Sequence, residues 1–253
     1  MQFSGRGILL DIEGTTSSVS FVYDVMFPYV RKHLTFAVGT NWLEPEYAVA
    51  LDALACDAGH PSLDAWLKAN GLSRDNPLRA ANLVCQEATL LMDRDAKATG
   101  LKQLQGLIWK GGFEGGELLA HVYCDVPPAL DVWKAAGMDI RIYSSGSVQA
   151  QKLFFGHTLA GNLLGQFQGH YDTTCGPKKE PASYRKIAGE FGLPPSEILF
   201  LSDIVAELDA ARAAGLQTGL VVRPGNATEQ ASDGPPHAQI ARFSQLEIAW
   251  LAL

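Results

Sequence analysis

The chain has 253 residues, and 47% of them are apolar, which is enough for a sizeable core in one large domain or two small ones. Its formal net charge of −7 argues against a nucleic-acid partner, because an acidic surface repels phosphates. The sequence has no export leader, no apolar run near ~18 residues and four widely separated cysteines, which predicts a cytoplasmic protein that does not bind membranes.

The first predicted strand, residues 8–10, runs into a glycine turn that carries two carboxylates, Asp11 and Glu13. In an open parallel sheet, ligands bind just beyond the carboxyl ends of the strands, where these two side chains are expected. Gly14 allows the chain to turn and to point N–H groups at an anion. A helix N-cap explains one carboxylate more easily than two, so the pattern favours a functional site.

Between Thr16 and about Asp125 the apolar residues follow helical spacing. The predicted helices cover residues 24–36, 46–57, 63–69, 78–98 and 101–110. The glycines that follow, from Gly111 to Gly116, predict a flexible segment. Trp109 fits either contact with a substrate or packing in a core, and packing is the more common role of a tryptophan at helical spacing.

From Val126 onward, strand and helix patterns alternate. Strands are predicted at residues 140–143, 198–201, 218–222 and 240–243, and helices from residue 126, from residue 147 and over 181–191. We therefore expect an α/β fold in which residues 1–16 and 126–253 form a doubly wound parallel sheet with its helices. Residues 17–125 are expected to form an inserted helical domain.

Residue types that suit phosphate chemistry follow the later strands as well. Ser144, Ser145 and Gly146 follow the strand at 140–143, Lys178 precedes the helix at 181–191, and Asp203 follows the strand at 198–201. Hydroxyls, amides and a helix N-terminus suit phosphate oxygens. Each residue has an ordinary explanation as a turn, a solvated lysine or a helix cap, but their joint order favours one site.

The order Asp11-x-Glu13-Gly14-Thr15, then Ser144, Lys178 and Asp203 resembles the four motifs of the haloacid dehalogenase superfamily. Glutamate at position 13, where the superfamily usually has a second aspartate, makes the chain similar to the enolase-phosphatase E1 family. Further segments with this similarity are residues 27–29, 101–106, 142–148, 150–153, 183–188 and 221–227. The resemblance implies a Rossmann-like core with an inserted cap domain, and it is weak at residues 41–80.

The chemistry of these residues suits phosphoryl transfer. A carboxylate can attack phosphorus and form an aspartyl-phosphate, a role we assign to Asp11. Two anions approach each other only with a cation between them, so we expect one Mg²⁺ per subunit, with Asp11 and Asp203 as side-chain ligands. The resemblance implies that Glu13 binds the metal through its backbone carbonyl, which leaves its carboxylate to act as general acid and base.

The substrate phosphate is expected to be bound by Ser144 through its hydroxyl, by Ser145 and Gly146 through their amides, and by Lys178 through its ammonium group. Two adjacent lysines compete for the last role. Lys178 is preferred because it lies two residues after Gly176, as in the motif, whereas Lys179 is expected to be exposed to solvent.

Glu207, one helical turn after Asp203, suits three roles equally well: holding Lys178, holding metal-bound water, or lying on the surface as a plain acid.

The resemblance implies conversion of 2,3-diketo-5-methylthiopentyl 1-phosphate to an acireductone, by enolisation and then dephosphorylation, in L-methionine salvage. An acireductone synthase of this kind acts on a small phosphorylated diketone and is expected to be a monomer. The sequence identifies neither the base for enolisation nor the cap residues that contact the substrate. Two alternatives stay open: a generic phosphatase of this superfamily with another phosphorylated metabolite, and a non-catalytic phosphosugar-binding protein of the same fold.

Overall fold

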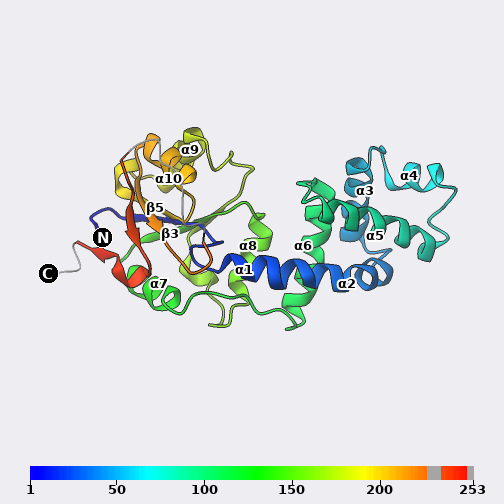
Figure 1. Cartoon of the computed structure of the whole chain (residues 1–253), viewed down its shortest axis with the longest axis horizontal. Coiled ribbons are helices and arrows are strands. Elements are labelled where there is room, and N and C mark those ends of the chain that lie inside the picture. Colours follow the sequence, from blue (N-terminus) through cyan, green and yellow to red (C-terminus); the bar gives the residue numbers. More distant parts are fainter. Residues whose placement is uncertain (227–234, 250–253) are drawn as a thin grey trace. The chain divides into compact units, whose positions relative to one another are not determined.

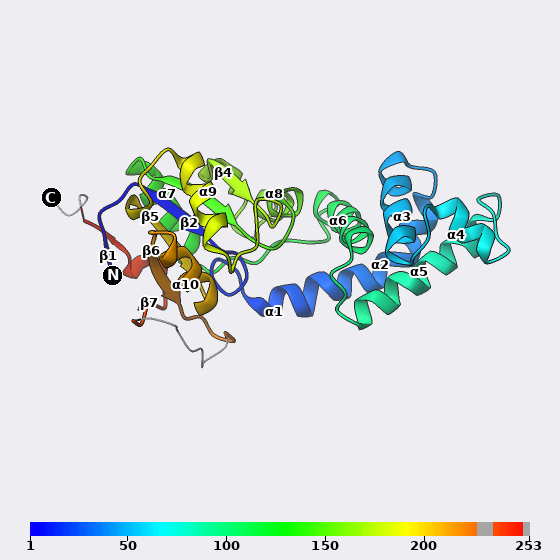
Figure 2. The same cartoon turned by 90° about the horizontal axis from the view of Figure 1, so that it is seen from above.

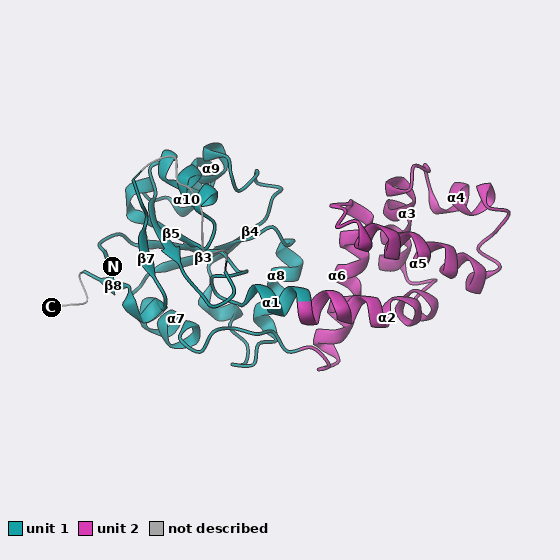
Figure 3. Ribbon diagram, in the orientation of Figure 1, with its two compact units in different colours: residues 1–23, 119–253 teal, residues 24–118 magenta. Residues whose placement is uncertain are grey.

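A computed structural model describes residues 1–226 and 235–249 of the chain. The chain forms two compact units, shown in teal and magenta in Figure 3. The core unit comprises Met1–Tyr23 and Leu119–Leu253, and the helical unit comprises Asp24–Leu118. Within the described residues, no helix has both the length and the apolar character needed to span a membrane.

The segments next to the unit boundary are tied into the core unit by specific contacts. Phe21 packs edge-on against Phe154, with 5.9 Å between the ring centroids. The backbone N–H of Tyr123 donates to the carbonyl of Thr16 at 3.0 Å. These contacts explain why the boundaries lie at residues 23/24 and 118/119, whereas the sequence places them at 16/17 and 125/126.

The core unit contains a six-stranded parallel sheet with the order β4-β3-β2-β5-β6-β7. Its strands are β2 (Gly7–Leu10), β3 (Asp139–Tyr143), β4 (Gly169–Tyr171), β5 (Ile198–Ser202), β6 (Gln217–Val221) and β7 (Ala238–Ile240). The chain winds outward in both directions from β2, which lies between β3 and β5. The predicted doubly wound sheet is confirmed, and the switch point beside β2 is the usual place for a ligand.

Three strands were missed and one was misplaced by the sequence analysis. β4 has the sequence Gly-His-Tyr, which carries no apolar run. Strands β1 (Gln2–Phe3) and β8 (Glu247–Ile248) are two residues long each, and they pair in parallel as a separate sheet near the labelled N-terminus (Figure 2). The strand predicted at 240–243 is wrong in position, because β7 ends at Ile240 and a 3₁₀ turn, Phe243–Gln245, follows.

Helices cover both faces of the sheet, and in Figure 1 α9 and α10 lie on the opposite side of it from α7. The helices are α1 (Val19–Phe21), α7 (Val126–Ala135), α8 (Val148–Gly156), α9 (Pro181–Phe191) and α10 (Val205–Ala213), with 3₁₀ turns at Leu164–Gln166 and Pro195–Glu197. Leu9 and Phe200 of the sheet pack with Tyr184 and Ile187 of α9 and with Leu208 of α10. Burial of this apolar face fixes α9 and α10 beside the carboxyl ends of β2 and β5.

The helical unit consists of α2 (Phe27–Thr40), α3 (Pro45–Asp57), α4 (Leu63–Ala69), α5 (Pro77–Asp93) and α6 (Thr99–Glu114), and a π-helical turn, Val22–Met26, precedes α2. Apolar side chains from all five helices form its core, among them Leu34, Leu54, Trp66, Val84 and Leu104. Trp109 packs against this core, and its indole N–H donates to the carbonyl of Met26 at 2.9 Å. The packing interpretation of Trp109 therefore agrees with the structure.

Three helix ends in this unit lie four or five residues from the sequence prediction, and the first is that of α2, which continues to Thr40 instead of ending at residue 36. Helix α5 ends at Asp93 because Asp95 adopts φ of +49°, a left-handed conformation that stops the helix. Helix α6 continues through Gly111 to Glu114, so the break predicted after Lys110 is wrong. At Gly112 the helix passes close to Tyr29, whose ring would lie 2.7 Å from a Cβ at this position.

Candidate active site

The candidate site lies where the central strands β2, β3 and β5 end. Leu10, the last residue of β2, is in register with Ile142 of β3 and Leu201 of β5. Asp11 follows Leu10, and its backbone N–H donates to the carbonyl of Leu201 at 3.0 Å. The parallel strands therefore deliver the residues after β2 and β5 to one edge of the sheet.

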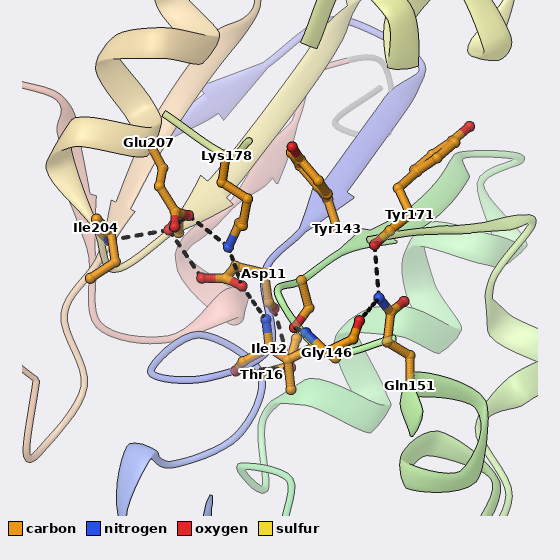
Figure 4. Close-up of polar contacts among 12 residues, drawn as sticks. Asp11, Ile12, Thr16, Tyr143, Gly146, Gln151, Tyr171, Lys178, Ile204 and Glu207 are labelled. Atoms are coloured by element: carbon orange, nitrogen blue, oxygen red, sulfur yellow. Dashed lines mark hydrogen bonds and ion pairs between the residues drawn. The ribbon is translucent and has the colours of Figure 1, made fainter. Parts of the chain in front are cut away.

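The carboxylate of Asp11 is buried and held by three donors. Its Oδ1 accepts hydrogen bonds from Lys178 Nζ at 2.7 Å and from the backbone N–H of Ile12 at 2.8 Å. Its Oδ2 lies 3.2 Å from the hydroxyl of Ser202. Figure 4 shows Lys178 pointing at Asp11 from the opposite side to Ile12. This arrangement fixes the orientation of the carboxylate before any ligand binds.

Lys178 bridges two acids. Its Nζ lies 2.7 Å from Asp11 Oδ1 and 2.7 Å from Glu207 Oε2. Burial alone would lower the pKa of Lys178, but the charges of Asp11 and Glu207 outweigh it and raise the pKa above its ordinary value. Burial, followed by the charge of Asp11, raises the pKa of Glu207 to about 7. Of the three roles considered for Glu207, contact with Lys178 is the one that this geometry matches.

The loop before α9 is held by hydroxyl groups that donate to three successive carbonyls. These hydrogen bonds join Tyr143 to Gly176 at 2.8 Å, Ser183 to Pro177 at 2.7 Å and Tyr184 to Lys178 at 2.6 Å. As a result, the side chain of Lys178 enters the site and is only 8% exposed, whereas Lys179 is exposed. The structure thus brings Lys178, and not its neighbour, to Asp11.

Asp203 lies against the loop of residues 11–17. A Cβ on Gly14 would come within 2.2 Å of Asp203 Oδ2, so the close approach requires glycine there. Burial, and next the negative charge of Asp11, raise the pKa of Asp203 to about 7. The charge of Glu13 adds to this effect.

The donors around Asp203 fit Mg²⁺. Residues 1–226 and 235–249 contain no cluster of three Asp, Glu, His or Cys side chains that could hold a metal. Mg²⁺ does not require one, because it usually takes one or two carboxylates from a protein and keeps several waters. Two crowded carboxylates, Asp11 and Asp203, beside a loop with backbone carbonyls are a donor set of this kind.

The loop after β3 brings the serine-rich segment to the same edge. Ser144 is buried, and its hydroxyl accepts a hydrogen bond from the backbone N–H of Gly146 at 3.2 Å, while Ser145 is exposed. The Gln151 amide donates to the carbonyls of Gly146 at 2.8 Å and Tyr171 at 2.7 Å (Figure 4). Gln151 therefore supports this loop from helix α8 and ties it to β4.

Comparison with known proteins identifies the family. A model of the haloacid dehalogenase-like hydrolase family matches residues 6–215. The protein named Enolase-phosphatase E1 from Pseudomonas aeruginosa strain UCBPP-PA14 is 46% identical over 243 residues, covering 96% of this chain and 98% of its own. The chain belongs to the enolase-phosphatase E1 family of haloacid dehalogenase-like hydrolases. It is therefore an enzyme, as the motifs predicted.

Other members and neighbours agree with this placement. Enolase-phosphatase E1 from Synechococcus elongatus is 44% identical, covering 89% of this chain and 92% of its own. The crystal structure of the UTR4 protein from Saccharomyces cerevisiae superimposes with a TM-score of 0.75 at 31% identity, covering 96% of this chain and all of that one. A dehalogenase at 18% identity and a TM-score of 0.54 shares the fold.

Two residues that support the site were not singled out by the motifs, Ser202 beside Asp11 and Gln151 beneath the 144–146 loop. The Ser202 hydroxyl lies 3.2 Å from Asp11 Oδ2 and 3.1 Å from Glu207 Oε2, so it links the two acids. From the sequence, Gln151 belongs only to the segment 150–153 that is similar to the E1 family. A serine next to a motif aspartate was the available signal for Ser202, whereas the role of Gln151 depends on a long-range contact with β4.

Proposed function

We propose that this hydrolase is a Mg²⁺-dependent enolase-phosphatase, an acireductone synthase of L-methionine salvage that acts on 2,3-diketo-5-methylthiopentyl 1-phosphate. The observation that carries the proposal is the buried Asp11 carboxylate, held by Lys178 at 2.7 Å at the end of the central strand. The names of the relatives supply the enolase half of the activity. The monomeric state and the cytoplasmic location stay predictions of the sequence.

In the phosphatase step, an oxygen of Asp11 attacks phosphorus, and the bond from phosphorus to the substrate oxygen breaks. The Lys178 ammonium balances the charge of Asp11 and of the equatorial phosphoryl oxygens. The hydroxyl of Ser144 and the amides of Ser145 and Gly146 bind the remaining oxygens. The Lys178 ammonium is preorganised and stabilises the transition state without reorganising, whereas the Gly146 N–H first leaves the Ser144 hydroxyl.

Glu13 carries the proton in both halves of the phosphatase step. It stands two residues after Asp11 in the same loop, and it is only partly buried. Its carboxyl group gives a proton to the leaving enol oxygen, and the resulting carboxylate then takes a proton from the water that attacks the aspartyl-phosphate. The second displacement returns Asp11 to the free carboxylate and releases inorganic phosphate.

Asp11, Asp203 and the backbone carbonyl of Glu13 would hold Mg²⁺. When bound, this ion neutralises charge as the anionic phosphate approaches Asp11 and polarises the substrate carbonyl for enolisation. Burial, and next the charge of Asp11, raise the pKa of Asp203, and the second effect supports this assignment because a bound cation would relieve the repulsion between the two carboxylates.

Substrate profiling tests the proposal directly. The purified protein is mixed with Mg²⁺ and the phosphorylated diketone, and the ultraviolet absorbance of the enol is followed together with free phosphate. We expect the enol to appear and phosphate to follow, with kcat/KM well above that for other phosphorylated metabolites. Phosphate release without an enol, or a higher kcat/KM for another metabolite, would favour a generic phosphatase. Binding without turnover of any ester would leave a non-catalytic protein.

A further inference from the structure

The segment Arg223-Pro224-Gly225-Asn226, which follows β6, forms a tight turn. The backbone N–H of Asn226 donates to the carbonyl of Arg223 at 3.1 Å, and Gly225 has φ of +87°. Proline at the second position and glycine with positive φ at the third define a type II turn. Such a turn has little freedom, so the side chains of its first and last residues are held in a fixed relation.

Both of these side chains donate to the loop that carries the proposed catalytic residues. Asn226 Nδ2 donates to the carbonyl of Gly14 at 2.9 Å, and Arg223 Nε donates to the next carbonyl, that of Thr15, at 3.2 Å. The N–H of Gly14 in turn donates to the carbonyl of Ser17 at 2.8 Å. The peptide groups on both sides of Gly14 are therefore fixed, including the one that contains the Glu13 carbonyl.

Arg223 is itself anchored. It is 5% exposed, and it makes a two-pronged ion pair with Asp125 at 2.8 and 3.0 Å. Its guanidinium lies over the rings of Tyr123 at 4.3 Å and Phe243 at 5.1 Å. A buried guanidinium that is paired and stacked in this way cannot move freely, so the contact with Thr15 is rigid.

Asn226 also presents an oxygen to the acidic part of the site. Its Oδ1 is buried and has no hydrogen-bond donor among the described residues. A Cβ on Gly14 would lie 3.0 Å from this oxygen and 2.2 Å from Asp203 Oδ2, so both oxygens face the same small space. A buried amide oxygen without a donor is costly, and a bound water is the usual way to satisfy it.

We propose that Arg223 and Asn226 are positioning residues for phosphoryl transfer. They hold the Gly14 and Thr15 carbonyls, and through them the Glu13 carbonyl, in the geometry that binds Mg²⁺. The Asn226 oxygen accepts a hydrogen bond from water beside Asp203. This inference rests on the proposed function, because it assigns the turn a role in that same site.

The test compares Asn226→Ala with Gln217→Ala. Gln217 is the first residue of β6, the strand that precedes the turn, and its amide also donates to a backbone carbonyl, that of Ser196 at 2.8 Å, but at the end of β6 away from the turn. For each variant, calorimetry measures the Mg²⁺ affinity. Assays with 4-nitrophenyl phosphate give kcat and KM, and thermal unfolding gives Tm. Residues that orient metal ligands typically contribute about 10- to 100-fold to affinity or activity. We expect Asn226→Ala to lose about tenfold or more in Mg²⁺ affinity and in kcat, with KM little changed, and Gln217→Ala to keep both.

Equal Mg²⁺ affinity and kcat in Asn226→Ala and the wild type would overturn the inference, as would equal losses in the two variants. If Asn226→Ala does not fold, Asn226→Ser takes its place, because serine is too short to bridge the loop and the turn. The wild type separates this inference from the proposed function. A wild-type protein that neither binds Mg²⁺ nor releases nitrophenol contradicts the proposed function, whereas an active wild type with an unaffected Asn226 variant contradicts only the positioning role.

Discussion

Two regions of the site differ in how their polar groups are satisfied. On the lysine side, made of Asp11, Lys178, Ser202 and Glu207, the charged groups are buried and contact one another at 2.7 to 3.2 Å. On the serine side, residues 144–146, the buried Ser144 hydroxyl accepts the Gly146 N–H at 3.2 Å, and Ser145 is exposed. The difference indicates that the charged groups of the lysine side are arranged during folding, and we expect the serine side to complete its contacts only when phosphate binds.

The largest expected effect comes from the centre of the lysine side. Asn has nearly the same shape as Asp but cannot attack phosphorus, so Asp11→Asn should lower phosphate release by several orders of magnitude. The fold should be retained, because Lys178 keeps its ion pair with Glu207 at 2.7 Å and the repulsion between residue 11 and Asp203 is removed. Phosphate release and the circular dichroism spectrum check this, and a rate near that of the wild type would show that Asp11 is not the nucleophile.

Removing the cation tests whether the two carboxylates need it. Excess chelator should stop phosphate release, and added Mg²⁺ should restore it. Ca²⁺ should inhibit, because its larger and looser coordination shell misplaces the phosphoryl group. Phosphate assays in chelator, with and without each ion, measure both effects. Full activity in excess chelator would remove the metal from the mechanism.

Lys178→Met and Lys179→Met form a matched pair at adjacent positions. Loss of the buried lysine should lower kcat by about 10²- to 10³-fold, as expected for one transition-state donor. It should also lower the free energy of unfolding by about 3 kcal/mol, because Asp11 and Glu207 are left buried without their partner. The exposed Lys179 should change neither quantity. Kinetics and urea unfolding of both variants decide between the two lysines.

The serine side should show a smaller effect of a different kind. Gln151→Met leaves the carbonyl of Gly146 without its side-chain donor, while the carbonyl of Tyr171 keeps only the backbone N–H of Ser144 at 3.1 Å, which loosens the 144–146 loop. We expect KM to rise about tenfold while kcat changes little, because phosphate binding is weakened and the lysine side is intact. Gln166→Met, which removes a hydrogen bond to Asp131 outside this loop, serves as the control. A fall in kcat without a change in KM would contradict the division between the two sides.

The sequence predicted the placement of the principal residues because strand ends are a local signal. Asp11, Ser144 and Asp203 each come at the end of a predicted strand, and the parallel sheet then brings those strand ends together. Lys178 was chosen by its spacing from Gly176, and the structure places it at Asp11. The roles of these residues stay proposals. Their position at one edge of the sheet, however, could be predicted from the order of strands and helices.

The hydrogen bonds that hold the loops of the site could not be predicted from the order of the strands. The contact of Gln151 with β4 joins residues 20 positions apart through a strand too short to be recognised, and that of Asn226 with Gly14 joins residues 212 positions apart. Asp95 ended α5 early through a backbone conformation that aspartate rarely adopts. Such features depend on tertiary contacts and local backbone geometry, which apolar spacing does not report.

In the proposed mechanism Asp11 becomes phosphorylated, and Glu13 activates the water that frees it. Glu13→Gln with 4-nitrophenyl phosphate tests both parts, because nitrophenolate leaves without a proton and Gln cannot activate water. After acid quench, mass spectrometry should find a phosphoryl group on the peptide containing Asp11, with one equivalent of nitrophenol released per protein and little free phosphate. Steady release of phosphate by this variant, with no phosphorylated Asp11 peptide, would contradict this mechanism.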